Sequence, residues 1–193
     1  MKIVIIDYGA GNIQSIQFAL QRLGYTAVLT SDRNIIAQAD KVIFPGVGEA
    51  SSAMNKLKES GLDSLIPGLK QPVLGICLGM QLMCRHSAEG DTTGLGIFDV
   101  DVVKFTPKVK VPQIGWNQIT DLKTPLFKEV AEKEYIYLVH SYYAPLCKDT
   151  IATSEYEVAY SSAIRKDNFW GVQFHPEKSS EVGAQILRNF VNI

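Results

Sequence analysis

The segment around Cys77 constrains the fold of this 193-residue chain more than any other. The apolar run Pro72-Val73-Leu74 leads into Gly75-Ile76-Cys77-Leu78-Gly79, and a helical pattern follows through Met83. This order predicts a buried strand, a sharp turn and a helix. Glycines two residues before and after the cysteine leave out Cβ atoms that would collide in such a turn. The thiol would then lie at a helix N-terminus, whose partial positive charge stabilises a thiolate.

Short apolar runs alternate with helical patterns through the first half of the chain. The expected strands cover residues 2–6, 27–29, 42–44 and 73–76, and the expected helices cover 13–23 and 49–59. Continuous apolar strands separated by helices are typical of a parallel sheet that is buried on both faces. The sequence therefore predicts an α/β fold, with an open, mostly parallel sheet and helices on both of its faces.

The second half of the chain has closely spaced strand patterns. Residues 97–105, 134–139, 151–153, 159–164 and 169–174 are strand-like, which predicts an antiparallel extension of the same sheet. A final amphipathic helix is expected to begin after Ser179 or Ser180, either of which can cap it. Because nothing in the composition resembles a linker, residues 1–193 are expected to form a single domain.

Composition and charge exclude several classes of protein. A net charge of −1 gives no electrostatic attraction for nucleic acid or for an acidic membrane. Three cysteines, Cys77, Cys84 and Cys147, do not form a disulfide framework, and none has the spacing of a metal site. The apolar start of the chain is too short for a signal peptide or a membrane span. We expect a cytoplasmic protein without metal or cofactor.

Cys77 needs a base if it is a nucleophile, and the segment Gln173 to Ser179 supplies a candidate. In open parallel sheets, sites form beyond the carboxyl ends of the strands. There His175 can take the thiol proton, and Glu177 can orient the imidazole and stabilise its charged form. Their spacing of two residues would direct both side chains to one face of an extended strand. The competing interpretation is a small buried cysteine and a histidine in a surface turn. Of the other histidines, His86 would lie far along the helix that follows Cys77, whereas His140 would end a strand near the site.

A second candidate element is the loop Pro45-Gly46-Val47-Gly48, which ends an expected strand. Its glycines would let backbone N–H groups approach a substrate carbonyl as an oxyanion hole. It is not a phosphate loop, because no Gly-Lys-Ser/Thr follows it. Gln81 lies one helical turn after Cys77 on the same face, so its amide can reach a bound substrate. Taken alone, the loop and Gln81 are equally compatible with an ordinary turn and a solvated helix residue.

Taken together, these segments resemble the class I, triad-type glutamine amidotransferases, which have a flavodoxin-like fold. The matching motifs are P-G-V-G at 45–48, G-I-C-L-G-M-Q at 75–81 and F-H-P-E at 174–177. The resemblance implies a triad of Cys77, His175 and Glu177, with a γ-glutamyl thioester on the cysteine. It implies an oxyanion hole from the backbone N–H groups of Leu78 and of the 46–48 loop, Val47 and Gly48. The expected glutamine-binding residues are Gly46, Gln81, Ser141 and Tyr142.

Further segments resemble one branch of that family, the glutaminase subunits of imidazole glycerol phosphate synthases of histidine biosynthesis. These segments are residues 7–12, 112–117 and 139–143, and Lys178-Ser179 after the triad. The resemblance implies a heterodimer in which ammonia from L-glutamine passes to a cyclase subunit with a (β/α)8 barrel. That subunit would form imidazole glycerol phosphate and aminoimidazole carboxamide ribonucleotide. Tyr142, Trp116 and Lys178 are the expected interface residues.

Three other functions remain open at this point. The chain could serve another synthase, such as those for pyridoxal phosphate, anthranilate or GMP, with the same chemistry at Cys77. It could instead hydrolyse γ-glutamyl peptides without any partner. A non-catalytic binding subunit is the third possibility, although an intact set of Cys77, His175 and Glu177 argues against it.

Overall fold

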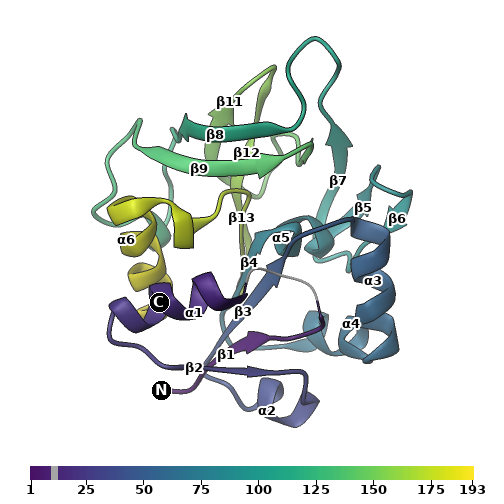
Figure 1. The fold of residues 1–193 in the computed structure, drawn as a ribbon, viewed down its shortest axis with the longest axis vertical. Coiled ribbons are helices and arrows are strands. Elements are labelled where there is room, and N and C mark those ends of the chain that lie inside the picture. The colour runs from purple at the N-terminus through teal and green to yellow at the C-terminus, as the bar shows by residue number, and fades with distance from the viewer. Residues whose placement is uncertain (10–12) are drawn as a thin grey trace.

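The computed structural model describes residues 1–9 and 13–193 and confirms the α/β fold (Figure 1). A central sheet runs in the order β11-β12-β13-β4-β3-β1-β2. Strands β2, β1, β3, β4 and β13 are parallel, and β12 and β11 are antiparallel to their neighbours. In chain order, these strands are β1 (Ile3–Ile6), β2 (Ala27–Thr30), β3 (Lys41–Gly46), β4 (Val73–Cys77), β11 (Thr150–Glu155), β12 (Ala159–Lys166) and β13 (Phe169–Val172). The predicted antiparallel extension is therefore present in β11 and β12.

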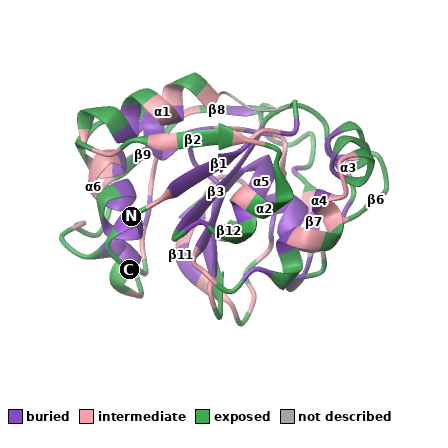
Figure 2. Cartoon of the chain, turned by 90° about the horizontal axis from the view of Figure 1, so that it is seen from below, coloured by how far each residue is buried: buried purple, intermediate pink, exposed green. Residues whose placement is uncertain are grey.

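Helices cover both faces of this sheet. Alternate residues of β1 point to opposite sides, so Val4 and Ile6 join one buried cluster while Ile3 and Ile5 join the other. Helices α2 to α5 contribute to the first cluster, and α1 and α6 contribute to the second. The helices are α1 (Ile13–Arg22), α2 (Arg33–Ala37), α3 (Ala50–Glu59), α4 (Leu62–Leu65), α5 (Leu78–Met83) and α6 (Ser180–Val191), with short 3-10 turns η1 (Ile66–Gly68), η2 (Pro125–Phe127) and η3 (Pro176–Lys178). Figure 2 shows β1 and β3 buried between these layers, which explains their uninterrupted apolar sequences.

Two strand patterns that we expected in the sheet extension lie elsewhere. The strand expected at 97–105 belongs to a separate sheet in the order β10-β7-β5-β6, and the strand expected at 134–139 pairs with the 113–118 segment. The prediction that these two strands extend the central sheet was wrong, because period-two alternation identifies a strand but not the strand with which it pairs. These strands are β5 (Cys84–Ser87), β6 (Thr92–Thr93), β7 (Phe98–Lys104), β8 (Gln113–Gln118), β9 (Tyr135–His140) and β10 (Tyr142–Tyr143). Figure 1 shows β8 and β9 crossing one end of the molecule beside α6.

Smaller differences from the sequence predictions concern element ends. Helix α5 stops at Met83, so the expectation that His86 lies on it was wrong; His86 is in β5. Helix α2 was not predicted, although its cap is visible in the sequence: the Asp32 carboxylate accepts from the backbone N–H groups of Asn34 and Ile35. The motif at residues 7–12 extends into residues 10–12, which lie outside the described residues. Among the helices that the structure describes, none is long and apolar enough to span a membrane.

Candidate active site

Cys77 occupies a strained turn between β4 and α5. Its φ of 54° and ψ of −111° lie in a region that non-glycine residues rarely adopt, and such strain is typical of functional positions. The flanking glycines are required by close contacts. A Cβ atom on Gly79 would lie 2.0 Å from the Phe44 carbonyl oxygen, and one on Gly75 would lie 2.3 Å from Met83 Cε. The turn forms because both positions lack side chains, as the sequence predicted.

His175 and Glu177 form the pair that the sequence predicted. His175 Nδ1 lies 2.8 Å from Glu177 Oε1, and their side chains are 6% and 1% exposed. Burial by itself lowers the pKa of His175, but hydrogen bonds with Cys77 and Glu177, and the charges of both, outweigh it and raise that pKa to about 10. Because Nδ1 faces Glu177, the other ring nitrogen is the one available to Cys77. The structure therefore brings thiol, imidazole and carboxylate together in series.

The backbone of His175 is held by β9 and by Ser179. His175 N–H donates to the Tyr137 carbonyl at 2.9 Å, and its carbonyl accepts from Ser179 Oγ at 2.7 Å. Ser179 Oγ in turn accepts from Tyr137 N–H at 2.9 Å. Ser179 occupies the N-cap position of α6, as predicted, but among the described residues its hydroxyl makes no capping hydrogen bond to that helix, and Ser180 is the first residue of the helix. The strand-face argument for His175 and Glu177 was wrong, because Glu177 lies in the 3-10 turn η3.

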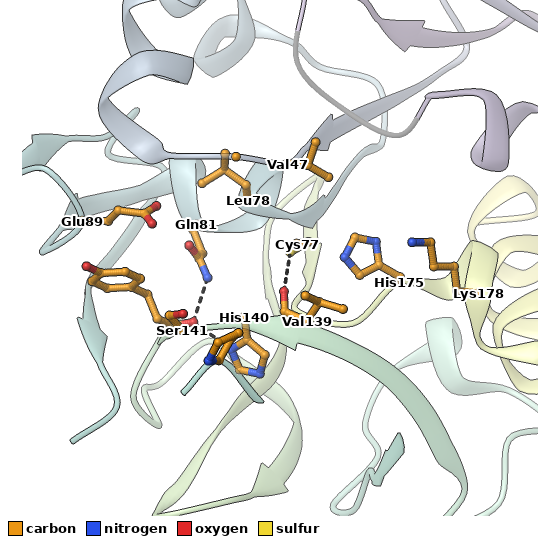
Figure 3. Close-up of a pocket in the computed structure, with 13 residues that line it drawn as sticks. Val47, Cys77, Leu78, Gln81, Glu89, Val139, His140, Ser141, His175 and Lys178 are labelled. Atoms are coloured by element: carbon orange, nitrogen blue, oxygen red, sulfur yellow. Dashed lines mark hydrogen bonds between the residues drawn. The ribbon is translucent and has the colours of Figure 1, made fainter. Parts of the chain in front are cut away.

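A cavity of about 340 Å³ opens at Cys77 (Figure 3). Figure 3 shows Cys77 at its centre, with Gln81 and Glu89 on one side and His175 and Lys178 on the other. The lining residues are Val47, Gly48, Cys77, Leu78, Gln81, Glu89, Pro112, Val139, His140, Ser141, Tyr142, His175 and Lys178. Most of the predicted site residues therefore meet in one cavity.

The register of β3 on β4 sets the Val47–Gly48 loop beside the cysteine. Gly46 pairs with Cys77, so the chain leaves β3 at the level of the thiol. Gly48 has a φ of +98°, which glycine adopts without strain. Gly46, an expected glutamine-binding residue, packs its α-carbon against α5, where an added Cβ would be 2.6 Å from Gly79 N. The backbone of Val47 and Gly48 and the first N–H of α5, at Leu78, are thus close to Cys77.

Polar residues that line the cavity across from Val47 and Gly48 are hydrogen-bonded to each other. The Tyr142 carbonyl accepts from Gln81 Nε2 at 2.9 Å and from His140 Nδ1 at 2.8 Å. Burial, which outweighs that hydrogen bond, lowers the pKa of His140 to about 4. His140 is consequently neutral near pH 7 and unsuited to hold a charge in the site. Gln81 is only 4% exposed, so it is a fixed part of the cavity wall and not a solvated helix residue.

Comparison with known proteins identifies the family. The model of "Glutamine amidotransferase class-I" matches residues 4–193. The chain belongs to the class I glutamine amidotransferases. Proteins named imidazole glycerol phosphate synthase subunit HisH are similar over their whole length: that of Bacteroides thetaiotaomicron is 54% identical and that of Pectobacterium atrosepticum 49% identical, each with 100% of both chains covered. At this identity the chain is also a member of the HisH group, and it is a glutamine amidotransferase by family.

Solved structures agree with the fold of a class I amidotransferase. The structure of PurLQS from Thermotoga maritima has a TM-score of 0.73 at 15% identity and covers 99% of this chain and 97% of its own. A further glutamine amidotransferase from Thermotoga maritima has a TM-score of 0.64 at 16% identity, with 100% and 83% covered. At such identities the likeness shows the fold alone.

The expected interface residues of this class I amidotransferase lie in two places. Trp116 on β8 is 53% exposed and contacts the Tyr137 ring edge-on at a centroid distance of 5.9 Å. Lys178 Nζ lies 5.8 Å from the centroid of the same ring. Tyr142 lies on β10 and lines the cavity, and Lys104 Nζ lies 5.6 Å from its ring centroid. Trp116 and Lys178 therefore flank Tyr137, and Lys178 also lines the cavity together with Tyr142.

Three residues of the amidotransferase site were missed by the sequence predictions. Gln173 is fully buried and contacts Cys77, and Ser179 anchors His175. The signal for Gln173 was a polar side chain within the otherwise apolar segment 169–174. Glu89 enters the cavity from beyond α5, and its Oε2 accepts from Ala50 N–H at 2.9 Å. The position of Glu89 depends on this long-range contact with Ala50, which no local sequence pattern predicts.

Proposed function

We propose that this chain hydrolyses L-glutamine at Cys77 and supplies the ammonia to a cyclase partner, as the glutaminase subunit of imidazole glycerol phosphate synthase. The observation that carries the proposal is the series Cys77, His175 and Glu177, of which Cys77 and His175 line a cavity, in a chain about half identical to HisH proteins. The domain would span residues 1–193. The reaction requires a reduced thiol, which suits the cytoplasm.

The chemistry follows from the order of the three groups. His175 takes the thiol proton, and Cys77 Sγ attacks the side-chain amide carbon of glutamine. The oxyanion that forms is bound by the N–H groups of Leu78 and of Val47 or Gly48. The C–N bond then breaks, His175 returns its proton to the leaving nitrogen, and ammonia departs from a γ-glutamyl thioester. Water that loses a proton to His175 cleaves the thioester to glutamate and frees the thiol.

The carboxylate and carbonyl groups of the cavity suit the amino-acid end of glutamine. Burial and the neighbouring charge of Glu49 raise the pKa of Glu89, so a cation bound beside it would stabilise its carboxylate. The α-ammonium of glutamine would be that cation. Ser141 and Tyr142 line the same side of the cavity and would contact the α-carboxylate and the chain of the substrate. Gly46, which pairs with Cys77 at the end of β3, would contribute to glutamine binding only through its backbone.

The partner would dock on the surface formed by Trp116, Tyr137 and Lys178. Ile114 and Trp116 are 62% and 53% exposed on the outer face of β8, and Tyr137 lies opposite Trp116 on β9. Aromatic groups with an adjacent cation are typical of interface centres. Lys178 also lines the cavity at Cys77, so a protein seated here would lie next to the point where ammonia is released. We propose a heterodimer with a (β/α)8-barrel cyclase on this face.

The test is glutaminase activity of the purified chain with and without the cyclase subunit and its nucleotide. Cys77→Ala should abolish glutamate formation, whereas Cys147→Ala, a half-buried cysteine outside the cavity, should leave it unchanged. A Cys77→Ala protein that still supported glutamine-dependent synthesis would refute the enzyme assignment. Full activity on γ-glutamyl peptides without any partner would instead identify a stand-alone hydrolase.

The docking surface has a separate test. Trp116→Ala should weaken binding of the cyclase subunit by at least tenfold in titration calorimetry, as expected for an aromatic interface anchor. Leu146→Ala is a matched control, since Leu146 is 52% exposed but lies outside the Trp116 surface. If both variants bound the cyclase subunit equally well, the interface would not include the Trp116 surface.

A further inference from the structure

The buried amide of Gln173 contacts the sulfur of Cys77. Gln173 follows β13, is fully buried, and places Nε2 3.7 Å from Cys77 Sγ. Its own backbone N–H donates to the Ser162 carbonyl at 2.8 Å, so the residue is fixed to β12. Burial of an amide in a protein core is unfavourable unless its polar atoms are hydrogen-bonded. The reason for this polar residue must therefore lie in the groups that it contacts.

The direction of the Gln173 amide is set from the other side of the cavity. A backbone carbonyl only accepts hydrogen bonds, so the group of Gln81 that faces the Tyr142 carbonyl at 2.9 Å must be its NH2. The second hydrogen of that NH2 is donated to Gln173 Oε1, also at 2.9 Å. Since the oxygen of Gln173 is thereby assigned, its NH2 faces Cys77. The result is a chain of hydrogen bonds, which we call the relay. In it Gln81 donates to the Tyr142 carbonyl and to Gln173, and Gln173 donates to Cys77.

We propose that Gln173 stabilises the thiolate of Cys77 by donating a hydrogen bond to its sulfur, and that Gln81 holds Gln173 in the orientation that permits this. The inference rests on the proposed glutaminase function and adds a residue to its reaction. An N–H donor strengthens its bond when the acceptor becomes an anion. The sulfur also lies 3.8 Å from the Val139 carbonyl, which accepts from the thiol but repels a thiolate. Gln173 offsets that repulsion, alongside His175.

The relay also limits what Gln81 can do for the substrate. Both hydrogens of its NH2 are used within the protein, at the Tyr142 carbonyl and at Gln173 Oε1. Gln81 lines the cavity, and only its Oε1 is left for a ligand. Gln81 therefore selects a hydrogen-bond donor on the substrate, such as an ammonium or amide N–H group, and not a carboxylate.

The test measures the thiolate directly, without glutamine or a partner. Alkylation of Cys77 by iodoacetamide is followed against pH, and its peptide is quantified by mass spectrometry because Cys84 and Cys147 are also present. Gln173→Met keeps the side-chain length and removes the donor. We expect alkylation at pH 7 to slow about tenfold and the midpoint of the pH–rate curve to rise by about one pH unit, as for loss of one hydrogen bond to a charged group.

Two comparisons separate this role from a packing effect. Gln71→Met is the matched control, since Gln71 donates to the Ile36 carbonyl at 2.9 Å far from the cysteine, and its curve should equal that of the unmodified chain. Gln81→Met should shift the curve in the same direction as Gln173→Met but less. The double variant should shift it no further than Gln173→Met alone, because the two residues act through one bond.

Several outcomes would overturn the inference. One is an alkylation curve that stays unchanged in a Gln173→Met protein with a normal melting temperature. Another is a double variant whose shift equals the sum of the two single shifts. If Gln173→Met does not fold, an unchanged curve for Gln81→Met has the same consequence. Because alkylation needs no glutamine, the thiolate contact is tested independently of the proposed function. If the unmodified chain showed no glutaminase activity even with the cyclase subunit and its nucleotide, the proposed function would be refuted, while a shifted alkylation curve would still support the contact.

Discussion

Replacing Gly79 with alanine tests whether contact with β3 shapes the turn that carries Cys77. Gly79 lies within α5, where alanine is a better helix former by about 1 kcal/mol, so local propensity predicts a more stable protein. The structure predicts the opposite sign. The new Cβ would lie 2.0 Å from the Phe44 carbonyl oxygen and 3.0 Å from its carbon, and both atoms belong to a strand buried on its two faces.

The expected loss is about 3 kcal/mol, at the upper end of the range for overpacked cores, because backbone and not a flexible side chain must move. For a chain of this length such a loss lowers the melting temperature by about 6–12 °C. Gly68→Ala is the matched control: no heavy atom lies within 4 Å of its added Cβ, so stability should stay the same or rise slightly. The free energy of unfolding of both variants, measured in urea, tests this prediction. Equal stability of the two would refute the argument that the elbow is shaped by this contact.

Two further predictions concern hydrogen bonds near the site. Tyr8 Oη donates to the Pro45 carbonyl at 2.9 Å, so Tyr8→Phe should lower the free energy of unfolding by about 1 kcal/mol, measured in urea; no change would mean that water replaces the hydroxyl. Glu177→Gln removes a charge that helps raise the pKa of His175 to about 10. A raised histidine pKa stabilises the folded state fully below about pH 6.5, and the effect disappears as pH rises through 10. The melting temperature of the parent should therefore exceed that of Glu177→Gln most at pH 6 and converge with it above pH 10, and a constant gap would contradict the linkage.

Local sequence was sufficient for the elements whose neighbours in space are also neighbours in sequence. The strand, turn and helix around Cys77 were predictable because glycines at 75 and 79 and an apolar run specify a sharp turn within a few residues. The pairing of His175 with Glu177 was predicted for the wrong reason, since a 3-10 turn and not a strand face brings them together. The partners of β7 and β9 were mispredicted, because a strand pattern says nothing about which edge the strand joins.

The α/β class, the position of a reactive thiol and several of the residues around it could all be predicted from the order of the amino acids. Periodicity and glycine spacing are local properties, and each depends on only a few consecutive residues. The membership of Gln173 and Glu89 in the site, and the packing of Gly46 against α5, became clear only in three dimensions. Those outcomes depend on contacts between segments up to 96 residues apart, as between Cys77 and Gln173. Such contacts are fixed when the two faces of the sheet are covered, which no single segment encodes.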